Sequence, residues 1–286
     1  MKQSPALDAL LNSLQTVPAF HASTTPLYSF YKTVALAETK PLFSEGQSES
    51  VSFGPFGEIF LPYFKMGAID TVDLFGLDEL IIFAYYWANR ARYKKALDIG
   101  ANMGLHSILL DRCGIATTAF EPDPIHFKKL ISNLKLNQAT QVTPIEKAIS
   151  TQSGETEFIR VKGNTTSSHI AGAKENPYGE LDRFPVKIEA IAAIIEGIDL
   201  IKMDAEGHEK EILLGIPPAA WDRLDALVEI NDVANAHAVF DHFQRLGVHL
   251  FAQKLNWAPV TTAAEMPIGH RGGTLCITRK PHLNWE

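Results

Sequence analysis

The fold is decided by the stretch Ala96-Leu97-Asp98-Ile99-Gly100-Ala101-Asn102-Met103-Gly104. A short apolar run ends there in a loop with two glycines, and a helical pattern follows over residues 105–112. The pattern predicts a buried strand, a tight turn and a helix. Gly100 and Gly104 would let the backbone turn sharply and approach a ligand closely.

Short apolar runs and helical segments continue to alternate after this stretch. We expect strands at 96–99, 116–120, 142–149, 198–203, 226–230, 248–254 and 274–278, with an extra strand at 158–161. We expect helices at 105–112, 125–136, 191–196, 206–214 and 236–246. Such alternation predicts an α/β fold with a mainly parallel sheet covered on both faces. The last two strands, joined without a helix, would be antiparallel at one edge.

The first ninety residues have a different pattern. Leucines recur at helical spacing after Ser4-Pro5, a second helical piece covers 28–38, and 59–61 looks like one arm of a hairpin. Residues 78–90 are apolar nearly all round, which is typical of a buried helix. We therefore predict an N-terminal helical extension, 1–92, ahead of a ligand-binding domain, 93–286. The extension would cover the substrate or form the contact of a homodimer.

The composition narrows the class of protein. The chain has 286 residues, 46% of them hydrophobic and 21% charged, and a formal net charge of −7. It lacks the basic excess that would neutralise a nucleic-acid backbone, and its apolar runs are far shorter than the ~20 residues of a membrane span. Its two cysteines, Cys113 and Cys276, are too few for a disulfide framework. We expect a cytoplasmic protein with neither a nucleic-acid nor a membrane partner.

The glycine loop and a second acid point to a nucleoside ligand. The loop lacks the glycine spacing of dinucleotide sites and the Lys-Ser/Thr pair of a phosphate-binding loop, and it offers the carboxylate of Asp98 instead. Glu121 ends the next strand, 21 positions after Gly100, where a carboxylate can accept hydrogen bonds from ribose hydroxyls. A cationic ligand with an unphosphorylated ribose fits both acids, and S-adenosylmethionine has these properties. The alternatives are an ordinary turn with a surface acid, and an NAD-dependent oxidoreductase, which the glycine spacing disfavours.

Three segments together carry a family resemblance. They are Asp98-Ile-Gly-Ala-Asn-Met-Gly-Leu-His-Ser, Ala119-Phe-Glu-Pro-Asp-Pro and Leu200-Ile-Lys-Met-Asp-Ala-Glu-Gly-His-Glu. In this order they resemble the FkbM family of S-adenosylmethionine-dependent methyltransferases, over roughly residues 53–250. The resemblance implies a class I methyltransferase fold, a Rossmann-like sheet of seven mostly parallel strands with an antiparallel last strand. It also implies S-adenosylmethionine as the cofactor.

The resemblance also implies the cofactor-binding residues. Those expected to hold the methionine part are Asp98, Gly100, Asn102 and Gly104. Glu121 would bind the ribose hydroxyls. Asp123 and the segment 147–149, which includes Ala148, would flank the adenine.

The segment after the fourth strand holds the candidate catalytic residues. Methyl transfer needs positioning of the acceptor and removal of its proton, and Asp204, Glu206 and His208 are able to take that proton. Asp204 could equally orient the acceptor or the cofactor amine, so it is also a predicted cofactor-binding residue. The alternative is that Glu206 is an acid favourable to a helix N-terminus and His208 a helix-surface residue.

Three further points stay open from the sequence alone. Asp204 could converge with Glu229, Asn231 and Asp232 on Mg²⁺, although our prediction is a site without metal. The hydroxyl-rich loop 164–169 could line an acceptor pocket or be a plain surface turn. The segment 270–273 could clamp an anionic acceptor or be an exposed loop.

The function that we predict is methyl transfer from S-adenosylmethionine to a hydroxyl of a small polyhydroxylated or glycosyl acceptor. One alternative is N-methylation of a small molecule or a peptide. Another is a non-catalytic module that retains the nucleoside-binding fold. For the methyl transfer that we predict, the partner would be a small-molecule or glycan acceptor.

Overall fold

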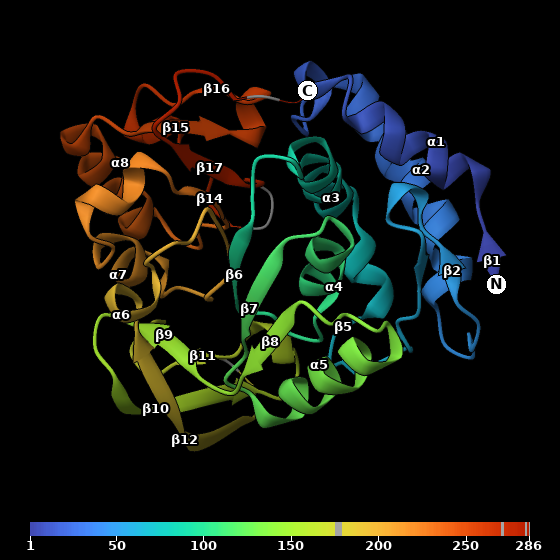
Figure 1. The fold of residues 1–286 in the computed structure, drawn as a ribbon, viewed down its shortest axis with the longest axis horizontal. Helices are drawn as coiled ribbons and strands as arrows, with labels where there is room; N and C mark the ends of the chain where they lie inside the picture. The colour runs from blue at the N-terminus through green and yellow to red at the C-terminus, as the bar shows by residue number, and fades with distance from the viewer. Residues whose placement is uncertain (175–178, 270–271, 284, 286) are drawn as a thin grey trace.

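The main sheet defines the architecture of the computed structural model, which describes residues 1–174, 179–269, 272–283 and 285. Eight strands follow the order β16-β15-β17-β14-β13-β6-β7-β8 (Figure 1). Their bounds are β6 (Lys95–Ile99), β7 (Ala116–Phe120), β8 (Val142–Ile145), β13 (Leu200–Met203), β14 (Asp225–Val228), β15 (His249–Ala252), β16 (Ala258–Pro259) and β17 (Leu275–Thr278). The neighbours from β8 to β14 run parallel, and β17 is antiparallel to both β14 and β15.

The expected mostly parallel sheet with an antiparallel last strand is therefore confirmed. The one addition is β16, a two-residue strand that pairs with β15 and brings the seven expected strands to eight. The last strand of the chain, β17, lies between β14 and β15 rather than at the edge.

Helices cover both faces of this sheet, as expected. One face carries α3 (Leu77–Asn89), α4 (Leu105–Arg112) and α5 (Pro124–Leu136), and the other carries α6 (Ile191–Ile194), α7 (Glu209–Leu214) and α8 (Val233–Leu246). Successive strand residues point to opposite faces, so Leu200 packs with the first group of helices and Ile201 with the second. Both faces are apolar, which explains why the central strands are short hydrophobic runs.

The N-terminal extension contains the helices α1 (Pro5–Leu14) and α2 (Pro26–Phe43). The Ser4 side chain caps α1 by accepting a hydrogen bond from the Leu7 N–H, and the leucines at helical spacing are buried as expected. The extension also contains two small sheets. One consists of β1 (Lys2–Gln3), β2 (Val51–Ser52) and β3 (Glu58–Ile59), and the other of β4 (Lys65–Met66) and β5 (Ile69–Asp70).

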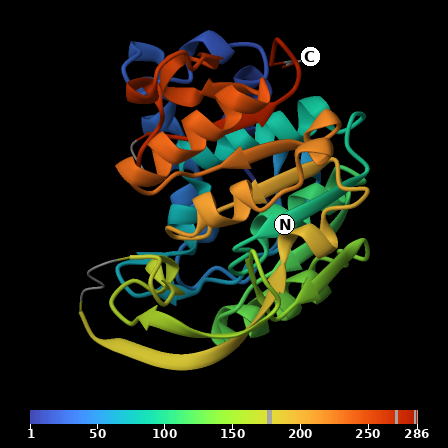
Figure 2. The same cartoon turned by 90° about the vertical axis from the view of Figure 1, so that its left-hand side faces the viewer.

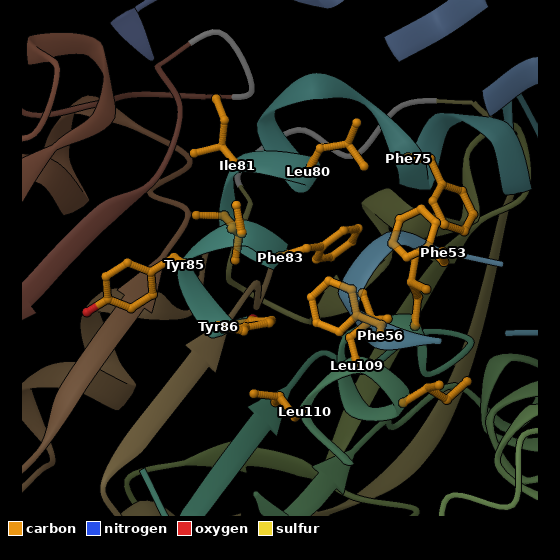
Figure 3. Close-up of a cluster of buried hydrophobic side chains, with 14 of the residues drawn as sticks. Phe53, Phe56, Phe75, Leu80, Ile81, Phe83, Tyr85, Tyr86, Leu109 and Leu110 are labelled. Atoms are coloured by element: carbon orange, nitrogen blue, oxygen red, sulfur yellow. The ribbon is translucent and has the colours of Figure 1, made fainter. Parts of the chain in front are cut away.

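The extension shares its hydrophobic core with the helices that cover the main sheet. Phe53 and Phe75 pack edge to face with ring centroids 5.4 Å apart. Figure 3 shows these rings near Phe83 of α3 and Leu109 of α4. The buried cluster is continuous across residue 92. Whether 1–92 is a separate folding unit stays a prediction.

A second sheet lies beyond the main one and was mostly missed from the sequence. Its strands are β9 (Ala148–Ser150), β10 (Gly154–Val161), β11 (His169–Ile170) and β12 (Leu181–Ala190), in the order β11-β10-β12-β9. Figure 2 shows it as a curved layer beneath the main sheet. The expected single strand over 142–149 was wrong, because β8 ends at Ile145 and β9 joins this second sheet. The extra strand expected at 158–161 is the end of β10.

Within the ranges that the structure describes, no helix combines the length and the apolar character needed to cross a bilayer.

Candidate functional site

A cavity with about 660 Å³ of unfilled space, part of it open to solvent, lies where β6, β7 and β13 end. This is the carboxyl edge of the sheet, at the point where the strand order reverses, and α/β proteins bind ligands at such a point. The second sheet and the loop after β10 form the opposite wall.

Backbone packing explains both loop glycines. Gly100 has φ +77°, and a Cβ there would lie 1.9 Å from the carbonyl oxygen of Asp204. Gly104 has φ +86°, and a Cβ there would lie 2.4 Å from Leu130 Cδ1 of α5. Gly100 lines the cavity, whereas Gly104 lies outside its wall and serves helix packing.

Asn102 forms the tip of the glycine loop. Its φ of +51° is in the left-handed region, which asparagine adopts more readily than most residues other than glycine. Its N–H donates to Glu121 Oε2 over 2.8 Å. Its side chain lines the cavity, and its buried Oδ1 has no hydrogen-bond partner among the described residues. Asn102 therefore brings a buried acceptor without a partner among the described residues to the wall of the cavity.

Glu121 is held rigidly in the cavity wall. Its Oε1 accepts a hydrogen bond from the Asp123 N–H and its Oε2 from the Asn102 N–H, both 2.8 Å long. Burial raises the pKa of this carboxyl to about 8, although the two backbone donors act to lower it. Each oxygen keeps a lone pair that could accept from a ligand hydroxyl.

Asp123 joins the two sheets. Its Oδ1 accepts from the Ile125 N–H at the start of α5, and Arg160 of β10 pairs with both carboxylate oxygens at 2.6 and 2.7 Å. Asp123 and Ala148, which were both predicted to flank the adenine, line the cavity. Arg160 was not foreseen from the sequence.

Asp98 lies outside the cavity wall. Its Oδ2 accepts a hydrogen bond from Ser107 Oγ over 2.6 Å, and its Oδ1 is 3.8 Å from Lys202 Nζ. The side chain is fully buried and connects β6 to α4. Its predicted contact with the methionine part of the cofactor therefore stays a prediction.

The structure brings the three candidate catalytic residues to the cavity wall. The buried Oδ1 of Asp204 has no hydrogen-bond partner in the described part of the chain. Burial, with Glu229 and Glu206 nearby, raises the pKa of the Asp204 carboxyl well above its usual value. Glu206 pairs with Lys174 at 2.5 Å. His208 Nε2 lies 3.0 Å from Ser150 Oγ, and burial lowers the pKa of the imidazole.

Glu209 holds the turn after β13, a role that sequence reasoning missed. Its carboxylate accepts from the N–H groups of Ala205 and Gly207 and from Asn231 Nδ2, at 3.0–3.1 Å. Burial raises its pKa to about 7. Because of this turn, α7 begins at Glu209, and the expected helix start at 206 was wrong. The only signal was an acid at the start of a helix after a glycine.

The other open residues are also placed. Asn231 donates to Glu209 and Asp232 accepts from the Asn235 N–H, so two of the four magnesium candidates have structural roles. Throughout the described ranges, no group of three or more His, Cys, Asp or Glu side chains is arranged to hold a metal ion.

The loop at 164–169 lines the cavity through several polar side chains. The buried His169 Nε2 has no hydrogen-bond partner among the residues described. The segment 270–273 was the candidate for clamping an anionic acceptor. Its two residues other than glycine, His270 and Arg271, lie outside the described residues.

Comparisons with known proteins agree with the motifs. The family model described as the Methyltransferase FkbM domain matches residues 98–250, more than half of the chain. Methyltransferase sdnD of Sordaria araneosa is 26% identical over 200 residues, covering 57% of this chain and 76% of that protein. Hexuronic acid methyltransferase AglP of Haloferax volcanii is 27% identical over 148 residues, covering 47% of this chain and 54% of AglP.

Solved structures with similar folds include the METTL16 MTase domain. It has a TM-score of 0.46 at 12% identity, with 96% of this chain and 92% of that chain covered. A TehB-like SAM-dependent methyltransferase from Corynebacterium glutamicum has a TM-score of 0.35 at 13% identity, with 70% and 89% covered. On the strength of the family model, the chain belongs to the FkbM family of methyltransferases, enzymes whose methyl donor is S-adenosylmethionine.

Proposed function

We propose that the protein transfers a methyl group from S-adenosylmethionine to a hydroxyl of a small polyhydroxylated or glycosyl acceptor. One observation carries the proposal. Three buried polar atoms without a partner among the described residues belong to residues of the cavity wall: Asn102 Oδ1, His169 Nε2 and Asp204 Oδ1. Buried polar groups are nearly always hydrogen-bonded in folded proteins, so these atoms favour a polar ligand at this site.

The residues present fit S-adenosylmethionine. Glu121 would accept hydrogen bonds from the ribose hydroxyls, while Asn102 and Asp204 would contact the methionine part. Ile149 and Phe158 give the adenine end an apolar wall. When bound, the cofactor supplies an electrophilic methyl group on a positively charged sulfur, and the carboxyls of the wall suit that charge.

Asp204 is our first choice for the residue that orients the acceptor and takes its proton. Its buried Oδ1 has no hydrogen-bond partner among the described residues and could accept from an acceptor hydroxyl. Burial raises the pKa of Asp204, and the positive sulfur of a bound cofactor would act to lower it again. Glu206 is already paired with Lys174, and His208 lies against Ser150. We therefore assign Glu206 and His208 to the wall of the cofactor cavity, with a smaller part in proton removal.

The acceptor class rests on two supports. Thr165, Thr166 and Ser168 line the cavity and supply hydrogen-bonding groups suited to a sugar. A relative, AglP, is named as a hexuronic acid methyltransferase. Both favour a hydroxylated acceptor over a peptide.

The test has a binding step and a transfer step. We expect S-adenosylhomocysteine to bind in isothermal titration, and Glu121→Gln to weaken that binding about tenfold through its ribose contacts. Glu58→Gln serves as the matched control, since Glu58 is exposed and lies outside both this cavity and the second cavity described below. Radiolabelled S-adenosylmethionine is then offered with methyl glycosides, amino sugars and hexuronic acids. Absence of cofactor binding would refute the proposal, and binding without transfer would favour a non-catalytic module.

A further inference from the structure

A second, smaller cavity, which opens to solvent, adjoins the first one at the same edge of the sheet. Asp204 belongs to the walls of both cavities. The remaining polar wall comes from Glu79 of α3, His106 of α4, Lys202 of β13 and Glu229 after β14. The extension thus contributes to this cavity through α3.

The positions of the two cavities follow the strand order. The cofactor cavity lies over the ends of β7, β6 and β13, and the second cavity lies over β13, β14 and the residue before β17. Neighbouring strands are about 4.8 Å apart, so the cavities are adjacent. In methyl transfer the acceptor atom approaches the carbon from the side opposite to the sulfur. An acceptor site must therefore meet the cofactor site at one shared point, and Asp204 is such a point.

The second cavity is rich in carboxyl groups. Glu79, Asp204 and Glu229 face it, against the ammonium of Lys202. Lys202 Nζ also lies 3.8 Å from the buried Asp98. Burial acts to lower the pKa of Lys202, but Asp98 and these three carboxyls together hold it above its usual value. The lysine thus neutralises part of an acidic surrounding and leaves an excess of negative charge.

His106 adds a fixed polar group to the wall. Its Nδ1 lies 2.9 Å from the Tyr86 hydroxyl and its Nε2 lies 2.9 Å from Glu79 Oε2. These two contacts fix the orientation of the ring between α3 and α4. Glu79 is thereby held at the cavity wall as well.

We propose that the second cavity is the acceptor pocket, and that Glu79 and Glu229 make it select an acceptor group that donates hydrogen bonds and carries no negative charge. Hydroxyl and amine groups meet this condition, whereas a carboxylate does not. Among glycosyl acceptors the inference therefore favours neutral and amino sugars over the hexuronic acids for which AglP is named. The inference rests on the proposed function and narrows its substrate class. It makes Glu79 and Glu229 specificity residues.

The test uses probes that reach from one cavity into the other. In two analogues of S-adenosylhomocysteine, nitrogen replaces the sulfur and carries either a 3-hydroxypropyl or a 2-carboxyethyl arm at the methyl position. We expect isothermal titration to show about tenfold tighter binding of the hydroxypropyl analogue, because like charges repel in a partly buried site. Glu79→Gln and Glu229→Gln should each reduce that preference by about threefold or more. Both variants should bind S-adenosylhomocysteine itself as the wild type does.

Controls separate the inference from the proposed function. Glu58→Gln should leave all three affinities unchanged, and thermal unfolding shows whether each variant is folded. Equal binding of the two arms, or tighter binding of the carboxyethyl arm, overturns the inference while cofactor binding stands. Weaker binding of S-adenosylhomocysteine in both Gln variants would assign the second cavity to the cofactor and also overturn it. If S-adenosylhomocysteine does not bind the wild type, the proposed function fails and the inference fails with it.

Discussion

Gly100 is the position where a single added carbon should do the most damage to the site. In Gly100→Ala the new Cβ would lie 1.9 Å from the carbonyl oxygen of Asp204, with the backbone at φ +77°. The left-handed conformation costs an alanine ~1–2 kcal/mol, and relieving an overpacked contact costs ~1–3 kcal/mol more. We expect the free energy of unfolding to fall by about 2–5 kcal/mol.

Gly114 offers a matched control for this substitution. It has φ +74°, close to that of Gly100, but a Cβ there would meet nothing within 4 Å. Gly114→Ala should therefore show the conformational cost alone, partly offset by the ~0.4–1 kcal/mol that an alanine gains through the unfolded chain. Its destabilisation should be about 1 kcal/mol or less.

The assay is urea unfolding of both variants, with S-adenosylhomocysteine titration of the folded protein. The clash displaces either the glycine loop or the exit of β13, and both line the cofactor cavity. Gly100→Ala should therefore lose affinity, and Gly114→Ala should keep it. Equal stability losses in the two variants would refute the close approach of the loop to Asp204.

Three further predictions concern the buried acids. The pKa of Glu121 is about 8 in the folded protein against an ordinary 4.5, because burial favours the protonated form of its carboxyl. The free energy of unfolding should therefore fall by roughly 3–5 kcal/mol as the pH rises from 4.5 to 8. Urea titrations at pH 5 and pH 8 measure this loss, and Glu121→Gln should be nearly free of this contribution. Asp123→Asn, which weakens a buried paired carboxylate, should cost about 3 kcal/mol, whereas Arg183→Gln in an exposed pair should cost under ~1 kcal/mol in the same assay. Glu209→Ala removes the acceptor for three donors and should lower the free energy of unfolding by about 2–3 kcal/mol. Glu211 is more exposed, and Glu211→Ala should lower it by about 0.5 kcal/mol or less. Equal losses in the two variants would contradict the role given to Glu209 in the turn.

The parts of the fold that the sequence predicted are those with local signals. β7 and α4 were predicted with their observed bounds, because an apolar run beside a glycine turn identifies such elements without knowledge of their partners. β12 was missed because its pattern is interrupted by Arg183, Pro185 and Lys187. Its identity as a strand depends on pairing with β10, which is not visible in its own composition.

The same distinction holds for the site. Asn102, Glu121 and Asp204 were found because each follows the end of a predicted parallel strand, and the carboxyl ends of such strands meet at one edge. Arg160 and Glu209 were missed because their roles depend on distant partners. Arg160 lies 37 positions from Asp123, and Asn231 lies 22 positions from Glu209. Only the packing of the second sheet and of the turn makes these pairs.

The buried acids at this edge are costly to the empty protein. Glu121, Asp204 and Glu209 all have raised pKa values, because burial disfavours their charged forms. A buried carboxyl without backbone donors therefore lowers the stability of the protein more than a neutral residue of similar shape would. Backbone donors hold Glu121 and Glu209 in place, but Asp204 Oδ1 has no such donor in the described ranges. The carboxyl with the least structural support is therefore the one shared by the two cavities. There a positively charged methyl donor and the proton lost by an acceptor hydroxyl would both interact favourably with it, and that gain accounts for a buried acid at the junction.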